Sequence, residues 1–201
     1  MNSCITCKEA IEHCMSTHTF AFAHLYGDEK IMDMHIHNCC EVYYSISGGK
    51  QFLIDHCLYD IRPGDLFLIN QFESHHLTQI DQQTHERIIL SIDPEYLSKL
   101  STGVTDLGHC FSFRDTRMPH QIHLSPKEQN RFMYFIHELH DDGGMGEDLL
   151  DQAIFLELMV FLNRAFAARC TDAAVPAQAP SSNYHAQVDA ILSYINSNIG
   201  E

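Results

Sequence analysis

Positive charge is scarce in this 201-residue chain, which has 12 lysine and arginine residues against 27 aspartate and glutamate residues. The resulting net charge of −15 repels phosphate, so we expect the chain by itself to bind nucleic acid poorly. The sequence also lacks an apolar run of membrane-spanning length, and residues 1–10 lack the apolar core of a signal peptide. These absences predict a cytoplasmic protein with no membrane partner.

Cysteine is abundant, with eight residues, but a chain with 45% hydrophobic residues can build a core without disulfides. We therefore expect reduced thiols. Cys4 and Cys7 form a lone C-x-x-C pair, and only His13 and Cys14 lie near enough in the sequence to complete a four-ligand zinc site. The favoured interpretation is two free thiols in a mobile N-terminal segment, residues 1–17.

Residues 19–92 read as short strands separated by turn signals. Gly48-Gly49 and Arg62-Pro63-Gly64-Asp65 are turn sequences, since proline fixes φ and glycine permits positive φ. Even spacing of short strands is typical of a β-sandwich or barrel. The expected strands cover residues 19–26, 34–46, 51–54, 57–61, 66–69 and 87–92.

Two helices should follow, because the hydrophobic period changes from two to about 3.6. Ser125 and Glu128 form a capping box with Pro126 at the first helical position. A second helix is predicted from Glu147 to about Ala168, antiparallel to the first because the connection is short. This second helix has more apolar residues than one barrel face can cover, so we expect a homodimer through residues 147–168.

The C-terminal part changes composition. Residues 171–182 are rich in alanine, proline and serine, which indicates a linker, and we place its end at residue 185. Residues 188–199 are again amphipathic. An amphipathic helix after a linker, with the sequence ending at Glu201, indicates the start of a second domain that has been truncated.

Chemistry concentrates in residues 35–43. On a strand, odd-numbered residues share one face, and here they are His35, His37, Cys39, Glu41 and Tyr43. Two imidazoles and a carboxylate on one face suit a divalent metal ion. A further ligand has to come from another strand, and the candidates are His75 and His76.

This spacing resembles the first motif of the cupin family, H-x-H-x3-E-x6-G, through His35, His37, Glu41 and Gly48; Glu29 stands where the fuller motif has a glycine. The second cupin motif resembles residues 63–65 with His75 downstream, although its closing asparagine is not evident. Over nearly its whole length the chain looks like the sensor half of an AraC-type transcriptional regulator. Residues 59–70 followed by His75 are similar to that family's Y-x-l-x-p-G-D-l-x-L-I-n-x-x-x-x-H stretch.

The resemblance implies a mainly β fold, a cupin or jelly-roll barrel in residues 18–124, followed by two antiparallel dimerisation helices in residues 125–170. Residues 171–185 would be the linker, and residues 186–201 the start of a helix-turn-helix DNA-binding domain. A small-molecule effector would bind among His35, His37, Cys39, Glu41, Tyr43 and His75. No catalytic step is implied, and DNA would be bound only through the missing domain.

Two interpretations of the barrel histidines remain open. His35, His37, Glu41 and His75 would hold Zn, Ni, Fe or Mn, or else the same groups hydrogen-bond one another and the effector without a metal. If a metal leaves coordination positions open for a substrate, the alternative function is a metal-dependent cupin enzyme of the oxygenase or isomerase type. A stand-alone sugar-binding module is a third candidate.

Overall fold

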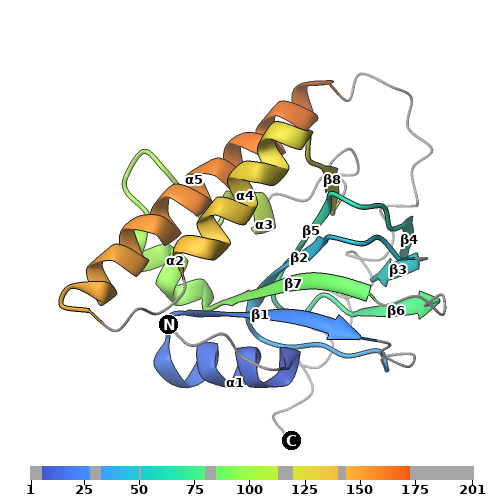
Figure 1. The fold of residues 1–201 in the computed structure, drawn as a ribbon, viewed down its shortest axis with the longest axis horizontal. Coiled ribbons are helices and arrows are strands. Elements are labelled where there is room, and N and C mark those ends of the chain that lie inside the picture. Colours follow the sequence, from blue (N-terminus) through green and yellow to red (C-terminus); the bar gives the residue numbers. More distant parts are fainter. Residues whose placement is uncertain are drawn as a thin grey trace, which may run out of the picture.

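Two β-sheets and a layer of helices make up the fold, shown in Figure 1. The structure is a computed structural model that describes residues 6–27, 33–49, 51–79, 85–112, 120–139 and 144–172. The strands are β1 (Phe20–Gly27), β2 (Cys40–Ser45), β3 (Gln51–Ile54), β4 (Cys57–Asp60), β5 (Asp65–Ile69), β6 (His75–Gln79), β7 (His85–Ile92) and β8 (Gln121–His123). The helices are α1 (Cys7–Thr17), α2 (Pro94–Leu100), α3 (His109–Ser112), α4 (Pro126–Glu138) and α5 (Glu147–Asp172).

The larger sheet has the strand order β1-β7-β2-β5-β8, and the smaller has the order β4-β3-β6. All of the strand pairs are antiparallel. Helices α4 and α5 lie side by side and run in opposite directions across one face of the larger sheet (Figure 1). The predicted fold class, mainly β with two antiparallel helices after the barrel, is confirmed.

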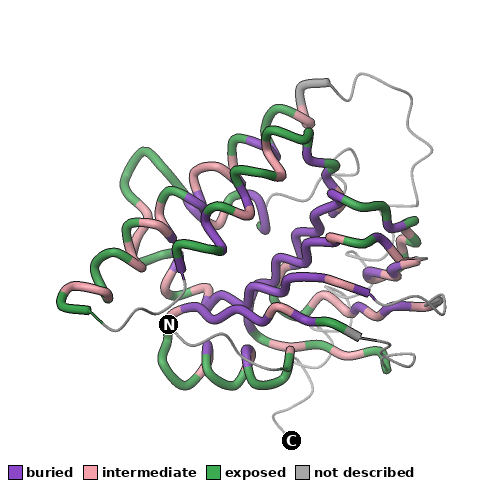
Figure 2. The backbone as a smooth tube through the Cα atoms, in the orientation of Figure 1, coloured by how far each residue is buried: buried purple, intermediate pink, exposed green. Residues whose placement is uncertain are grey.

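The larger sheet is buried on both faces, as the unbroken purple of its central strands shows in Figure 2. Val42 and Tyr44 of β2 pack toward the helices, where Tyr44 lies 4.6 Å from Phe132 of α4 between ring centroids. Tyr43, between them in sequence, packs instead with Phe52 and Phe67 inside the sandwich. Because both faces are covered, β2 and β5 are continuously apolar or buried and do not alternate with polar residues.

The predicted strand over residues 34–46 is wrong in its first half, because β2 begins only at Cys40. Cys40 is paired with Ile92, the last residue of β7, after which Asp93 caps α2. No β7 residue therefore remains to pair with the residues before Cys40. They turn toward the smaller sheet instead, where His35 forms an isolated bridge with His75 of β6.

The N-terminal segment, expected to be mobile, contains α1. Thr6 and Glu9 form a reciprocal capping box, with distances of 3.1 and 3.2 Å between side-chain oxygen and backbone nitrogen. Ala10 and Cys14 are fully buried against the interior cluster of the sandwich. Cys4 lies outside the described residues, and no disulfide joins the cysteines that the structure describes.

The helical layer begins as predicted, where the Ser125 backbone N–H donates to Glu128 Oε2 at 2.8 Å. Helix α5 continues to Asp172, beyond the expected end near Ala168 and into the first two positions of the predicted linker. The rest of the linker and the amphipathic residues 188–199 lie outside the described residues. Among the described helices, none is long and apolar enough to span a membrane.

Candidate functional site

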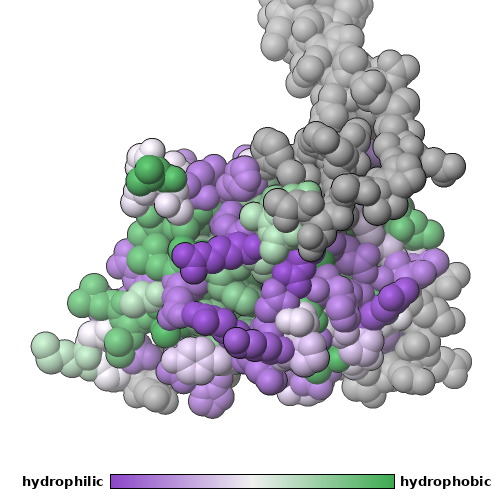
Figure 3. Space-filling view, turned by 90° about the horizontal axis from the view of Figure 1, so that it is seen from above, coloured by the Kyte–Doolittle hydropathy of each residue, from purple (hydrophilic) through white to green (hydrophobic). Residues whose placement is uncertain are grey.

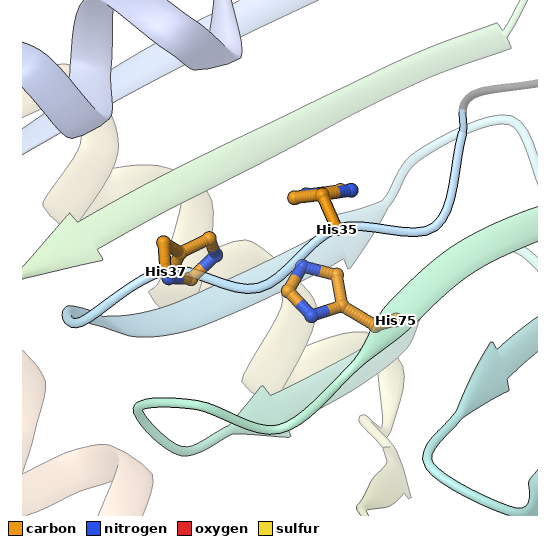
Figure 4. A group of neighbouring side chains, drawn as sticks. All are labelled: His35, His37 and His75. Atoms are coloured by element: carbon orange, nitrogen blue, oxygen red, sulfur yellow. The ribbon is translucent and has the colours of Figure 1, made fainter.

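Three histidines from two separate segments of the chain meet in the sandwich. His35 and His37 lie on the segment before β2, and His75 is the first residue of β6. One ring nitrogen of each lies within 4.8 Å of the others. The three rings lie close together in Figure 4, edge to face, with centroids 4.3 Å apart for His35 and His75 and 5.0 Å apart for His37 and His75.

Backbone carbonyls fix the orientation of all three rings. The Nδ1 atom of His35 lies 3.1 Å from Asp33 O, that of His37 lies 2.9 Å from Cys39 O, and that of His75 lies 2.8 Å from Glu73 O. A carbonyl oxygen only accepts, so each Nδ1 carries the hydrogen and donates it. The Nε2 atoms are therefore left to form the chemical site, which is how histidine ligands are held in metal centres.

Glu41 supplies a buried negative charge beneath these rings. Its side chain is 2% exposed, and Oε2 lies 3.1 Å from His37 Nε2 and 3.8 Å from His75 Nε2. The first distance is a hydrogen bond, whereas the second is too long for one. His75 Nε2 has no hydrogen-bond partner among the described residues, although it is buried. An additional cation or ligand at this position would satisfy that nitrogen.

The pKa values follow from this arrangement. Burial lowers the pKa of His37, but its hydrogen bonds with Cys39 and Glu41 outweigh burial and raise the pKa to about 10. Burial raises the pKa of Glu41, yet the neighbouring histidines hold it well below its usual range. The pKa of His75 is raised, because Glu41 outweighs the effect of burial, whereas burial and the charge of His75 lower the pKa of His35. His37 and Glu41 thus form a buried ion pair.

Cys39 adds a thiol to the same cluster. Its Sγ lies 3.2 Å from His37 Nδ1, and its side chain is hydrogen-bonded to Cys14 of α1. The hydrogen bond from Cys14 is the main cause that lowers the pKa of Cys39, and it correspondingly raises the pKa of Cys14. The thiol of Cys39 therefore tends toward the thiolate, which supports the charged form of His37.

Two other residues considered from the sequence, Tyr43 and His76, are not part of the cluster of three histidines. Tyr43 packs with Phe52 and Phe67 in the interior cluster, and it approaches the histidines only through Phe52, whose ring lies 6.0 Å from that of His75. His76, the alternative candidate to His75, points to the other face of β6 because side chains alternate along a strand. Among the described residues, it belongs to no cluster of possible metal ligands. The sequence did not indicate Cys14, which only long-range packing brings here, or the Glu73 carbonyl, which lies two residues before His75.

The residues fit a divalent metal ion by their chemistry. Three imidazoles whose Nδ1 atoms are bonded to backbone carbonyls, together with one carboxylate, form a donor set suited to Zn, Ni, Fe or Mn. Such an ion would also satisfy the buried Nε2 of His75. Because imidazole ligands must be neutral, the ion has to displace the proton that His37 holds.

A separate surface pocket of about 370 Å³ lies between β4 and β8. Its central carboxylate, Asp65, already accepts hydrogen bonds from the backbone N–H of Arg62, from Gln121 Nε2 and from His123 Nδ1. These bonds satisfy Asp65 within the protein, which is a structural role. The histidine cluster is therefore the better candidate for function.

Comparison with known families agrees with this geometry. Residues 19–159 match the family described as "AraC-like ligand binding domain", which is well over half of the chain. The chain belongs to the AraC-like ligand-binding domain family. The structure accordingly is a cupin-like β-sandwich with C-terminal helices. No curated protein matches the chain.

Several solved cupin structures are similar to the AraC-like domain at low identity. An RmlC-like cupin from Shewanella frigidimarina NCIMB 400 is 17% identical, with a TM-score of 0.34 over 38% of this chain and 68% of that one. The DMSP lyase DddQ from Ruegeria pomeroyi DSS-3 is 21% identical, with a TM-score of 0.33 over 37% of this chain and 38% of that one. A mutant of Bacillus subtilis oxalate decarboxylase OxdC is 19% identical, with a TM-score of 0.35 over 42% of this chain and 24% of that one. These similarities establish neither an activity nor a ligand.

Proposed function

We propose that the chain is the effector-sensing and dimerising part of an AraC-type transcription regulator, in which a small molecule in the barrel controls a following DNA-binding domain. The family match supports ligand binding. The observation that carries the regulatory part is strand β2. Glu41 of β2 belongs to the histidine cluster, whereas Val42 and Tyr44 contact the helical layer.

In this mechanism, strand β2 and the helices packed on it have two conformations, and these couple effector binding to dimer assembly. A ligand that contacts His37 and Glu41 differently in the two conformations shifts their populations, and the shift is limited by its differential affinity. Tyr44 and Phe132 then transmit the change to α4, because their rings are in contact. No chemical conversion of the effector is required.

The dimer surface is assigned to the beginning of α5. Leu149 and Leu150 are 66% and 61% exposed, and Met145 and Tyr134 are also exposed. Figure 3, which looks onto the helices, shows green apolar side chains gathered toward the end of the layer where α5 begins. Exposed apolar residues grouped in this way favour an interface between two copies.

Light scattering on the wild type and on a Leu149→Glu, Leu150→Glu variant tests the dimer. We expect twice the chain mass for the wild type and the chain mass for the variant. Leu58→Glu is a matched control, because Leu58 is similarly exposed, at 56%, but lies on β4 of the smaller sheet, away from α5. A monomeric wild type at tens of micromolar, or a variant that keeps the wild-type mass, would contradict the proposed interface.

A divalent metal ion at the histidine cluster is the second part of the proposal, with His35, His37, His75 and Glu41 as its ligands. Elemental analysis of the wild type and of His37→Ala, both purified without a histidine tag, tests it. The expected result is metal in the wild type and a large loss in the variant. Equal metal content in both would rule out this ligand set.

The alternative function is a metal-dependent cupin enzyme, which the three histidines and Glu41 favour by composition. The regulator and the enzyme make different predictions for the Leu149→Glu, Leu150→Glu variant. An enzyme confined to the barrel retains its turnover as a monomer, whereas a sensor loses its effect on a fused reporter. The test fuses the wild type and the variant in turn to a DNA-binding domain that represses only as a dimer. Measuring repression by each fusion separates the regulator from the enzyme.

A further inference from the structure

A second cluster of metal-type ligands lies outside the histidine cluster. Asp55 is in the turn between β3 and β4, Glu73 is in the connection between β5 and β6, and His120 immediately precedes β8. One ligand atom from each lies within 4.8 Å of the others. The three residues are far apart in sequence, so the fold alone assembles them.

His120 is the most informative member, because its side chain is buried and incompletely satisfied. The residue is 9% exposed, and its Nε2 has no hydrogen-bond partner within the described residues. That nitrogen nevertheless lies 3.2 Å from Glu73 Oε2, so the contact is close but its geometry is not that of a hydrogen bond. A buried imidazole nitrogen in this state costs free energy unless a further group satisfies it.

Neither neutral tautomer of His120 removes this cost. Its other nitrogen, Nδ1, is 2.9 Å from the Tyr59 hydroxyl. If Nδ1 donates to Tyr59, the Nε2 lone pair faces the negative Glu73 carboxylate. If Tyr59 donates to Nδ1, the Nε2–H is not directed at Glu73. A cation between Nε2 and the carboxylates satisfies all of these atoms in the first tautomer, with Tyr59 holding the ring as an outer hydrogen-bond partner.

The two carboxylates are positioned by their own backbone contacts. Asp55 Oδ1 accepts from the backbone N–H and the hydroxyl of Ser74, at 3.0 and 3.1 Å. Glu73 Oε2 accepts from the Asn70 backbone N–H at 2.7 Å. These bonds hold both carboxylates in place before any ion binds, which reduces the ordering cost of binding.

We propose that Asp55, Glu73 and His120 form a second binding site for a divalent transition-metal ion of the zinc type. One imidazole nitrogen and two carboxylate oxygens leave a fourth position for water, which is the ligand set that an open zinc site uses. The ion would connect the smaller sheet, through Asp55, to the larger sheet, through His120 at the start of β8. The argument for this second site rests neither on the regulatory function nor on a metal ion at the first cluster.

Glu73 also links this second site to the first. Its backbone carbonyl accepts the Nδ1–H of His75 at 2.8 Å, while its side chain belongs to the second cluster. An ion that fixes Glu73 therefore also fixes the ring of His75. We expect zinc at the second site to strengthen ligand binding at the first.

Zinc binding to the full chain, purified without a histidine tag and dialysed against buffered micromolar zinc, tests the site. We expect His120→Ala and Asp55→Asn each to hold one zinc ion fewer per chain than the wild type. The amide introduced by Asp55→Asn retains an oxygen that accepts from Ser74, so this variant keeps the turn. His37→Ala removes a different ion if the first cluster also binds zinc, and the two losses are then additive.

The matched control is His18→Ala, because His18 pairs with Asp93 at 3.0 Å but belongs to no three-ligand cluster among the described residues. It should hold as much zinc as the wild type. Tyr59→Phe should weaken zinc binding about 10-fold, because the outer partner is lost. Circular dichroism confirms that each variant is folded. Wild-type zinc content in folded His120→Ala and Asp55→Asn would overturn the proposal.

Discussion

Because Arg169 is paired with the carboxylate of Glu128, we expect the domain to lose stability as the pH falls into the acid range. Its guanidinium forms two hydrogen bonds with Glu128, of 2.7 Å from Nη1 to Oε1 and 2.6 Å from Nη2 to Oε2. Nη2 also donates to the His123 carbonyl at 2.9 Å. The end of α5 is thereby joined to the start of α4 and to β8.

The size of this contribution follows from Glu128. The hydrogen bond from Arg169 is the main cause that lowers the pKa of Glu128 from 4.5 to about 2. A change of that size corresponds to about 3 kcal/mol of stability. The two side chains are 29% and 26% exposed, so solvent screening reduces it to about 1–2 kcal/mol. Because the pKa is lower in the folded state, this stability is present above pH 4.5 and is lost as the pH falls toward 2.

Urea unfolding followed by circular dichroism, from pH 7 down to pH 3, measures the effect. Arg169→Met keeps most of the apolar stem, and we expect it to be about 1–2 kcal/mol less stable than the wild type at pH 7. That difference should shrink as Glu128 becomes protonated. Arg131→Met is the control, since Arg131 and its partner Glu157 are 56% and 50% exposed. If the difference for Arg169→Met is independent of pH, the reasoning about Glu128 is wrong.

Three further outcomes are expected. Phe155→Ala should lower the free energy of unfolding by about 3–5 kcal/mol in urea titrations, because the buried ring stacks on Phe20 with centroids 4.3 Å apart. Gly64→Ala should cost at least about 1–2 kcal/mol, because φ is +86° and the new Cβ would lie 2.3 Å from Gln129 Nε2; adding Gln129→Ala should recover only the part due to the clash. Residues 1–201 should show no sequence-specific shift of DNA in gels at physiological salt, since the net charge is −15.

The sequence was most informative where a local pattern decides the structure. The capping box at Ser125 and the turn at Gly64 have the predicted conformations, because both depend on residues only a few positions apart. The parity of His35, His37 and Glu41 predicted their convergence, although strand β2 begins only at Cys40 and does not include the two histidines. The isolated bridge between His35 and His75 nevertheless brings these two residues together.

Apart from the approach of His75 to His35 and His37, the long-range contacts were not predictable from the sequence. Nothing near Cys14 indicates that α1 packs its thiol against Cys39, and a three-residue strand such as β8 has too few positions to show a period. His120 likewise acquires its neighbours Asp55 and Glu73 only through the folded chain. Such contacts depend on which strands lie beside one another, and a single sequence does not fix that.

Strand β2 separates the interior of the sandwich from the helical layer. Glu41 and Tyr43 face the interior of the sandwich, and Val42 and Tyr44 face the helices. Substitutions on one face of β2 can therefore leave the other face unchanged. A substitution on the interior face could alter ligand preference without altering the contacts with the helices. The backbone, in contrast, is common to both faces, and a ligand that displaces it moves the helix-facing residues directly. Under the proposed function, the side chains of these six residues would set ligand selectivity, and their shared backbone would carry the change to the helices.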